Sequence, residues 1–407
     1  MPLGMTLGTM AVDHEMRIDF EKLRKDRLEK TRAQMKKDGL GSILVFDRDN
    51  IRYITSTKLG PWADDKLNRY ALLAEGHDPI LFEIGSAVPT KRILCPWLQD
   101  IRPSKNDMRG SMTPLLNSNE KVAGEIYEIL KEWNLHEAPM GVDLMSVSLM
   151  LAFNKFGFDI RDGQATMQEA QKIKTDEEIQ LLEISAAMVD GAYYDVVEAI
   201  KPGIRENEVA AVMYKRLFEL GAENVHNVNC ISGDRAFPHP HDFSDRIIRP
   251  GDLVFLDIVN DFNGYKTCYY RTFCCGYPTE EQKEIYKITY DWMYDAIKLI
   301  KPGATTKEIC ECWPTYKELG ARNEYETMAL ELGHGVGIAH WSKPVIGHQC
   351  SIQYPEVIEE NMHFAVETYY GRNGQAARLE EQVVITKDGC RVITKFPCEQ
   401  PVACWKY

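Results

Sequence analysis

The chain has 407 residues, of which 44% are hydrophobic and 27% are charged. This length and composition predict a globular protein of two or three domains and exclude a single small module, a disordered chain, collagen and a coiled coil. The 61 acidic and 48 basic residues give a formal net charge of −13. That charge repels phosphate backbones, and no basic run is set apart from it, so we expect no nucleic acid partner.

The sequence also leads us to expect neither export nor membrane insertion. It contains no run of about 18 apolar residues, and the opening MPLGMTLGTMA lacks the basic start of a secretion signal. The 11 cysteines are an odd number and follow no CxxC pattern, which argues against a disulfide framework. We therefore expect a soluble cytoplasmic protein with reduced thiols and no membrane partner.

The first part of the chain alternates helical and strand patterns, which predicts one α/β domain over residues 1–165. The segment IRYITS is read as a strand because it is apolar and β-branched and follows the turn-like DRDN. In chain order, the predicted elements are a helix over 19–39, strands over 42–46 and 51–56, a strand pair over 70–85, and helices over 119–133 and 146–156.

Near residue 173 the composition shifts to a long charged helical pattern whose first turn is acidic, as the helix dipole favours. We place a boundary there and expect residues 173–407 to form a second domain. The segments IKPGIRENEV (200–209) and IKPGATTKEI (300–309) repeat a helix end, a Pro-Gly turn and a new helix start. This repeat indicates a pseudo-symmetric domain with a shared cleft. Strands are predicted over 252–259, 270–276, 363–370 and 379–386.

Acidic side chains interrupt apolar strands of the second domain. Asp257 lies within VFLDIV and Glu367 within HFAVETYY, where an ionised carboxylate costs several kcal/mol unless it meets a metal, a cation or hydrogen-bond donors. Alternation places Glu380 on the same strand face as Arg378. His334 lies between glycines in GHGVG, where a purely structural role is the alternative. Asp, Glu and His together are ligands of the kind that hold Mn, Fe, Co or Zn.

The order of these motifs resembles the creatinase, prolidase and methionine aminopeptidase family. The resemblance rests on a strand Asp, then GYKTCYYRTF, GHGVG, a strand Glu and RLEE, and it spans the chain. It implies an N-terminal creatinase-like α/β domain followed by a pita-bread catalytic domain, in a mixed α/β (α+β) fold. It also implies a metal-binding site built from the residues that match the family's ligands, namely Asp257, His334, Glu367 and Glu380.

The chain departs from that family pattern at one ligand. Cys268 stands where the family has its second metal-binding Asp, and a thiolate is softer than a carboxylate and cannot clamp two ions with two oxygens. A site with one divalent metal (Mn, Fe, Co or Zn), with Cys268 as a further ligand, and a site without metal both remain open. The resemblance further assigns catalytic roles to His239, His340, Glu367 and Glu380.

The function implied by the resemblance is hydrolysis of a C–N bond in a compact amide, amidine or cationic small molecule by His and Glu acid–base chemistry. Alternatives are a lyase acting across a C–S or C–N bond of an onium acid, an Xaa-Pro dipeptidase-like metallopeptidase and a non-catalytic binding protein. The lyase alternative rests on similarity to the dimethylsulfoniopropionate lyase of this fold, although Val259 and Cys268 stand where that enzyme has aspartates.

Aromatic residues near these motifs suggest how a substrate would be held. Rings beside carboxylates suit a quaternary ammonium, sulfonium or guanidinium group, although aromatic residues at such places also serve as ordinary core. Members of the family form homodimers, and we expect one here, with a partner subunit near the cleft. The predicted substrate-binding residues are Trp62, Tyr265, Tyr270 and Trp341.

Overall fold

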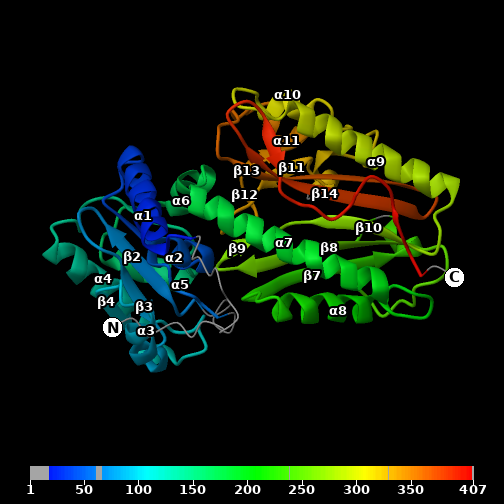
Figure 1. Cartoon of the computed structure of the whole chain (residues 1–407). Coiled ribbons are helices and arrows are strands. Elements are labelled where there is room, and N and C mark those ends of the chain that lie inside the picture. Colours follow the sequence, from blue (N-terminus) through cyan, green and yellow to red (C-terminus); the bar gives the residue numbers. More distant parts are fainter. Residues whose placement is uncertain (1–17, 61–66, 238, 329, 406–407) are drawn as a thin grey trace.

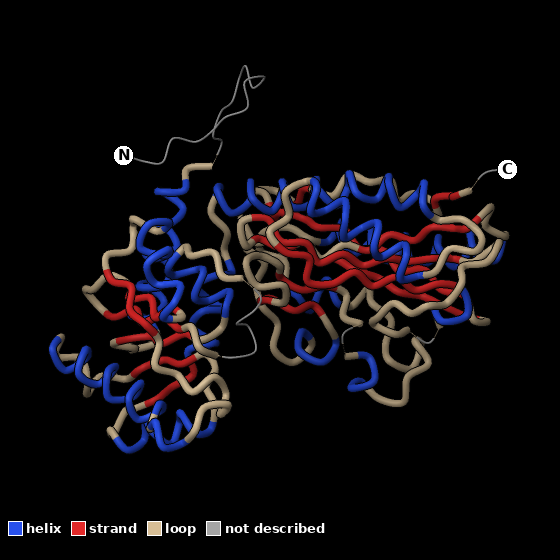
Figure 2. Tube along the Cα trace, turned by 90° about the horizontal axis from the view of Figure 1, so that it is seen from below, coloured by secondary structure: helices blue, strands red, loops and turns tan. Residues whose placement is uncertain are grey.

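The computed structural model describes residues 18–60, 67–237, 239–328 and 330–405. Over these residues an N-terminal sheet of six strands lies beside two C-terminal sheets of five strands each. Figure 1 shows the N-terminal part, in blue and cyan, to one side of the C-terminal part. In the view from below in Figure 2, the C-terminal strands form long layers framed by helices.

The N-terminal sheet has the strand order β4-β3-β2-β1-β5-β6 and is covered by helices. Asp19 starts the first helix by accepting hydrogen bonds from the backbone N–H groups of Glu21 and Lys22, both at 3.0 Å. The strands are β1 (Ser42–Val45), β2 (Tyr70–Ala74), β3 (Ile80–Glu83), β4 (Asp100–Pro103), β5 (Met140–Val142) and β6 (Ile160–Asp162). The helices are α1 (Phe20–Lys37), α2 (Arg48–Thr55), α3 (Val88–Leu94), α4 (Ser118–Glu132), α5 (Val147–Lys155) and α6 (Gly163–Lys172).

The strand predicted over residues 51–56 is wrong, because this segment is helix α2. Asp47 caps the helix, and its carboxylate accepts hydrogen bonds from the N–H groups of Asp49 at 2.9 Å and Asn50 at 3.1 Å. The sequence DRDN therefore starts a helix rather than forming a turn. Ile51 and Ile54 are three residues apart, as one helix face requires, and both are buried. The other predicted elements are confirmed.

The C-terminal part stacks its two sheets between helices. Figure 1 shows α9 along one side of the stack, with α7 and α8 along the other. The helices are α7 (Asp176–Ala199), α8 (Glu206–Glu219), α9 (Glu280–Leu299), α10 (Thr306–Cys310) and α11 (His348–Ser351). One sheet contains β7 (Asn224–Ser232), β8 (Leu253–Phe262), β9 (Tyr265–Lys266), β10 (Tyr270–Cys275) and β16 (Val402–Cys404). The other contains β11 (Gly333–Gly335), β12 (Ser342–Ile346), β13 (His363–Arg372), β14 (Gln375–Ile385) and β15 (Cys390–Val392). Short 3-10 helices cover Gly85–Ala87, Pro114–Leu116, Gly233–Ala236 and Glu324–Thr327.

The two repeated segments occupy matching environments in the two halves of this part. The N–H of Gly203 donates to the carbonyl of Ile248 at 3.0 Å, and the N–H of Gly303 donates to the carbonyl of Ile358 at 2.9 Å. Each of these isoleucines leads into a long strand, β8 or β13. Asp257 and Glu367 follow Ile248 and Ile358 at the same spacing. The pseudo-symmetry therefore places these two acids at equivalent points of the two sheets.

The boundary predicted between residues 165 and 173 falls on α6. A shared hydrophobic cluster joins Ile43 and Val45 of β1 to Leu181 and Leu182 of α7, so apolar packing links the two parts across it. The division into residues 1–165 and 173–407 stays a prediction. Among the described residues, no helix is both long and apolar enough to cross a membrane.

The repeated Pro-Gly turns give a test of the pseudo-symmetric frame. Gly203 and Gly303 have φ angles of +95° and +85°, a conformation that costs a residue with a side chain about 1–3 kcal/mol. We expect Gly203→Ala and Gly303→Ala each to lower the free energy of unfolding by that amount in urea titrations. Gly191→Ala in α7 is the control, because an added methyl group would meet only Leu220 at 3.7 Å and alanine favours helix. An equal free energy of unfolding in all three variants would contradict the role of the two positive φ angles.

Candidate metal centre and active site

The two sheets bring the predicted ligands together in the protein interior. Glu367 on β13 lies directly opposite Glu380 on β14, and Asp257 on β8 lies opposite Tyr270 on β10. His334 comes from the neighbouring strand β11. Asp257 is 4% exposed, Glu367 2%, and His334 and Glu380 0%. Their donor atoms belong to overlapping groups whose members lie within 4.8 Å of one another: Asp257, Cys268 and Glu380; His334, Glu367 and Glu380; Cys268, His334 and His340.

The donor atoms of this cluster fit a metal ion. The Nδ1 nitrogen of His334 donates to the Gly335 carbonyl at 3.0 Å, which leaves the Nε2 lone pair facing the cluster, 3.9 Å from an oxygen of Glu367. Among the described residues, His334 Nε2 and both carboxylate oxygens of Glu380 are buried without a hydrogen-bond partner. Buried polar atoms rarely stay unpaired. Such atoms from His and Glu are ligands that divalent transition metals accept.

Charge also favours a cation at this place. Asp257, Glu367 and Glu380 are buried together, and Arg378 forms an ion pair with Glu367. Burial raises the pKa of Asp257 to about 6. Burial, reinforced by the charges of Glu367 and Asp257, also raises the pKa of Glu380 well above its ordinary value. In both cases burial disfavours the ionised carboxylate, and a bound divalent ion would offset that cost.

Arg378 organises one side of the cluster. Its guanidinium lies 4.2 Å from the centre of the Tyr270 ring, pairs with Glu367 and donates to Nε2 of His239 at 2.7 Å. An arginine has no lone pair to offer, so His239 Nε2 must be the acceptor and the imidazole proton sits on Nδ1. Burial and the Arg378 charge hold the pKa of His239 well below its usual value. His239 is therefore a neutral imidazole that can donate from Nδ1.

Cys268 and His340 form the other side of the cluster. The Cys268 sulfur lies 3.4 Å from His340 Nε2 and 3.8 Å from a carboxylate oxygen of Asp257. Trp341 stacks on the His334 ring with centroids 3.9 Å apart, and its side chain remains 39% exposed. The indole thus covers one face of the His334 ring and restricts its orientation.

The predicted substrate-binding residues separate in the structure. Tyr270 and Trp341 lie at the cluster, whereas Trp62 lies outside the described residues. Tyr265 lies away from the cluster. Its hydroxyl donates to Glu178 at 3.0 Å and accepts from Arg27 at 3.2 Å, so its ring and hydroxyl serve the packing between the two parts of the chain.

Sequence reasoning missed two residues that hold the cluster in place. Asn229 on β7 pairs in register with Asp257 and donates to its carboxylate at 3.2 Å. Arg378 was placed on the face of Glu380 but was given no role. Both residues had a signal in the sequence, since Asn229 is a polar residue between the apolar Val228 and Cys230, and Arg378 stands two residues before Glu380.

A small cavity of about 270 Å³ reaches this cluster at His340. It lies between the N-terminal and C-terminal parts and carries charges of both signs. Lys266 at its wall pairs with Asp49 at 2.6 Å. Its other lining residues are Phe46, Asp47, Arg48, Leu67, Leu144 and His226. The cavity has the dimensions of a compact ligand rather than of a long peptide.

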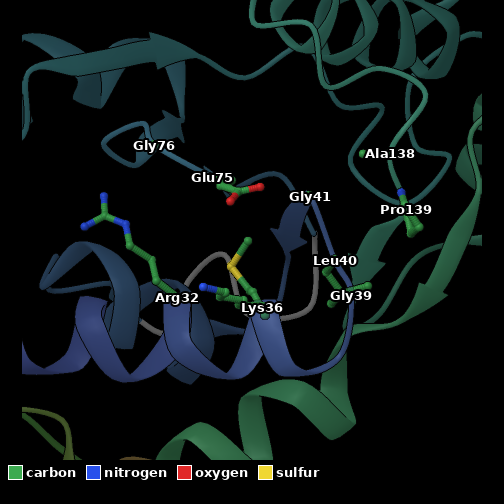
Figure 3. A pocket seen from close by; sticks show the side chains of 10 residues that line it. Arg32, Lys36, Gly39, Leu40, Gly41, Glu75, Gly76, Ala138 and Pro139 are labelled. Atoms are coloured by element: carbon green, nitrogen blue, oxygen red, sulfur yellow. The ribbon is translucent and has the colours of Figure 1, made fainter.

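A second cavity, of about 390 Å³, lies wholly within the N-terminal part. Figure 3 shows Arg32, Lys36 and Glu75 around it, together with the backbone of Gly39 and Gly41. None of its lining residues belongs to the candidate site. The metal-type cluster and this cavity are thus separate features of the molecule.

Comparison with known proteins places the chain in a family. Residues 180–387 match the model of metallopeptidase family M24. The chain is 32% identical over 279 residues to an Xaa-Pro dipeptidase of Pyrococcus furiosus, covering 67% of this chain and 76% of the relative. It is 22% identical to a dimethylsulfoniopropionate lyase of Roseobacter denitrificans, covering 97% of this chain and 91% of the lyase.

Solved structures agree with this placement. The prolidase of Pyrococcus furiosus superimposes with a TM-score of 0.69 at 27% identity, covering 89% of this chain and 99% of the prolidase. The expected pita-bread fold with an N-terminal domain is thereby confirmed. The chain belongs to metallopeptidase family M24 and is a hydrolase of that family.

Proposed function

We propose that the protein hydrolyses a C–N bond in a compact substrate, with one divalent metal ion held by Asp257, His334, Glu367 and Glu380. The convergence of these side chains supports the proposal. The strongest support is that His334 Nε2 and both Glu380 oxygens have no hydrogen-bond partner among the described residues. A divalent ion bound there would supply Lewis acidity to a scissile carbonyl. The small cavity beside His340 supports a compact substrate.

In this proposal Glu367 is the proton carrier. Its carboxylate is oriented by the ion pair with Arg378, and it takes a proton from the attacking water. The water oxygen bonds to the carbonyl carbon, the C–N bond breaks, and the proton passes from Glu367 to the leaving nitrogen. Fixing Glu367 before the reaction lowers the reorganisation that this transfer requires.

His239 serves in this proposal as a hydrogen-bond donor. Its Nε2 is occupied by Arg378, and its Nδ1 is buried without a partner among the described residues. A neutral imidazole in this position can orient a substrate oxygen through the Nδ1 proton. Acceptance of a proton is unfavourable next to the Arg378 charge, which leaves the base role to Glu367.

Hydrolysis of Xaa-Pro dipeptides is the second candidate function. The 32% identity to the Pyrococcus furiosus dipeptidase favours it, and the mixed charges around the His340 cavity suit a zwitterion. Cys268 argues against efficient dipeptide cleavage, because a thiolate in place of a carboxylate removes an oxygen ligand from a second metal position. A lyase activity, as in the Roseobacter denitrificans relative, would release an unsaturated acid instead of an amine and a carboxylic acid.

The first functional prediction concerns Glu380. Replacing its unpartnered carboxylate in Glu380→Gln removes a charged oxygen ligand, so we expect metal content to fall from about one ion per chain and turnover to fall more than about 100-fold. Elemental analysis and product assays measure both. Glu29→Gln on the exposed face of α1 should match wild type. Full metal content and activity in Glu380→Gln would remove this residue from the site.

The second functional prediction separates the two candidate substrates. Wild type should cleave Xaa-Pro dipeptides poorly, and Cys268→Asp should raise this activity at least about tenfold in the presence of Mn or Co, since it restores an oxygen donor. Cys268→Asn, similar in shape but uncharged, should show no gain. Wild-type dipeptide turnover near the enzyme median of about 10 per second would make dipeptide cleavage the primary function.

A further inference from the structure

Cys268 and His340 lie together at one edge of the buried carboxylates. Cys268 precedes β10, and His340 lies in the segment between β11 and β12. With His334 they form a group whose donor atoms lie within 4.8 Å of one another. Cys268 is 5% exposed and His334 is fully buried. This Cys–His–His group adds a sulfur and a second imidazole to the three carboxylates and one histidine named in the proposed function.

The distance between the two side chains fits metal ligation. A tetrahedral zinc ion binds sulfur at about 2.3 Å and imidazole nitrogen at about 2.0–2.1 Å, which puts the two ligand atoms about 3.5 Å apart. Cys268 Sγ and His340 Nε2 are 3.4 Å apart. The pair could therefore take up an ion without moving apart. His334 lies in the same group, and its Nε2 has no hydrogen-bond partner among the described residues.

The charges around Cys268 decide between a metal ligand and a thiol nucleophile. A nucleophilic thiolate needs a positive neighbour, whereas Cys268 faces Asp257 at 3.8 Å and belongs to one donor group with Glu380. Arg378 is committed to Glu367 and His239. A thiolate among these carboxylates requires a cation, and a bound divalent metal supplies it.

We infer that Cys268 and His340 join His334 and Glu380 as ligands of the single proposed ion, so that the centre binds a borderline-soft transition metal, zinc, cobalt or iron, in preference to manganese. The inference rests on the proposed function, since it names the ligands of that same centre. Sulfur and imidazole donors favour such ions, while all-oxygen sites favour manganese and magnesium. Cys268 is then a metal ligand in its own right, replacing the carboxylate of the family pattern.

Cobalt reports sulfur ligation directly. Metal-free full-length protein loaded with one equivalent of Co²⁺ should show an intense near-ultraviolet band from thiolate-to-cobalt charge transfer. Cys268→Ser should lose the band, and His340→Gln should bind cobalt at least about tenfold more weakly. Cys390→Ser, whose thiol contacts the Ile297 carbonyl, and His348→Gln, whose Nε2 contacts the Trp313 carbonyl, should match wild type in both the band and the cobalt affinity.

Absence of the band in cobalt-loaded wild type, or its persistence in Cys268→Ser, would overturn the inference. If Cys268→Ser does not fold, X-ray absorption of zinc-loaded wild type gives the same answer, with one sulfur at about 2.3 Å expected and only nitrogen and oxygen neighbours contradicting it. The proposed function is tested separately. If the protein hydrolyses C–N bonds but shows no thiolate-to-cobalt band, the proposed function holds and the Cys268 ligand is wrong. If the band appears without C–N hydrolysis, the metal site holds and the proposed function is wrong.

Discussion

The structure depends on the burial of three carboxylates in one place. Asp257, Glu367 and Glu380 are each at most 4% exposed, and Arg378 forms an ion pair with Glu367. Moving charged groups out of water is expensive unless opposite charge and hydrogen bonds accompany them. This constraint explains why Arg378 pairs with Glu367 and why Asn229 donates to Asp257. It also leads us to expect a metal ion beside Nε2 of His334, which has no hydrogen-bond partner in the described part of the chain.

Pseudo-symmetry explains how the chain builds such a cluster. Two similar units, each with a Pro-Gly turn and two long paired strands, face one another, and the acids occupy equivalent positions. The partner positions then diverge. Glu380 lies opposite Glu367, while Tyr270 lies opposite Asp257, and the Arg378 guanidinium stacks on that Tyr270 ring. The two halves thus differ: the Glu367–Arg378 ion pair lies on one sheet, and Cys268 precedes β10 of the other.

Sequence reasoning found the residues whose chemistry conflicts with their surroundings. Asp257 and Glu367 stand out because acids rarely interrupt apolar strands, and Glu380 follows from strand alternation. Contacts between distant segments were harder to predict. The hydroxyl of Tyr265 is held by Arg27 and Glu178, residues far away in sequence, and loop geometry decides that His340 reaches Cys268. The helix α2 was misread because Asp47 can start either a turn or a helix, and the choice depends on capping bonds.

The central claim is that one divalent ion completes the charge balance of this cluster. Its most direct test is thermal unfolding of metal-free protein during titration with zinc, since a ligand that binds only the folded state raises the melting temperature. The account predicts a rise that saturates at one equivalent of zinc per chain and disappears in the double variant His334→Gln, Glu380→Gln. A melting temperature that does not respond to zinc, or a rise that requires two equivalents, would contradict it.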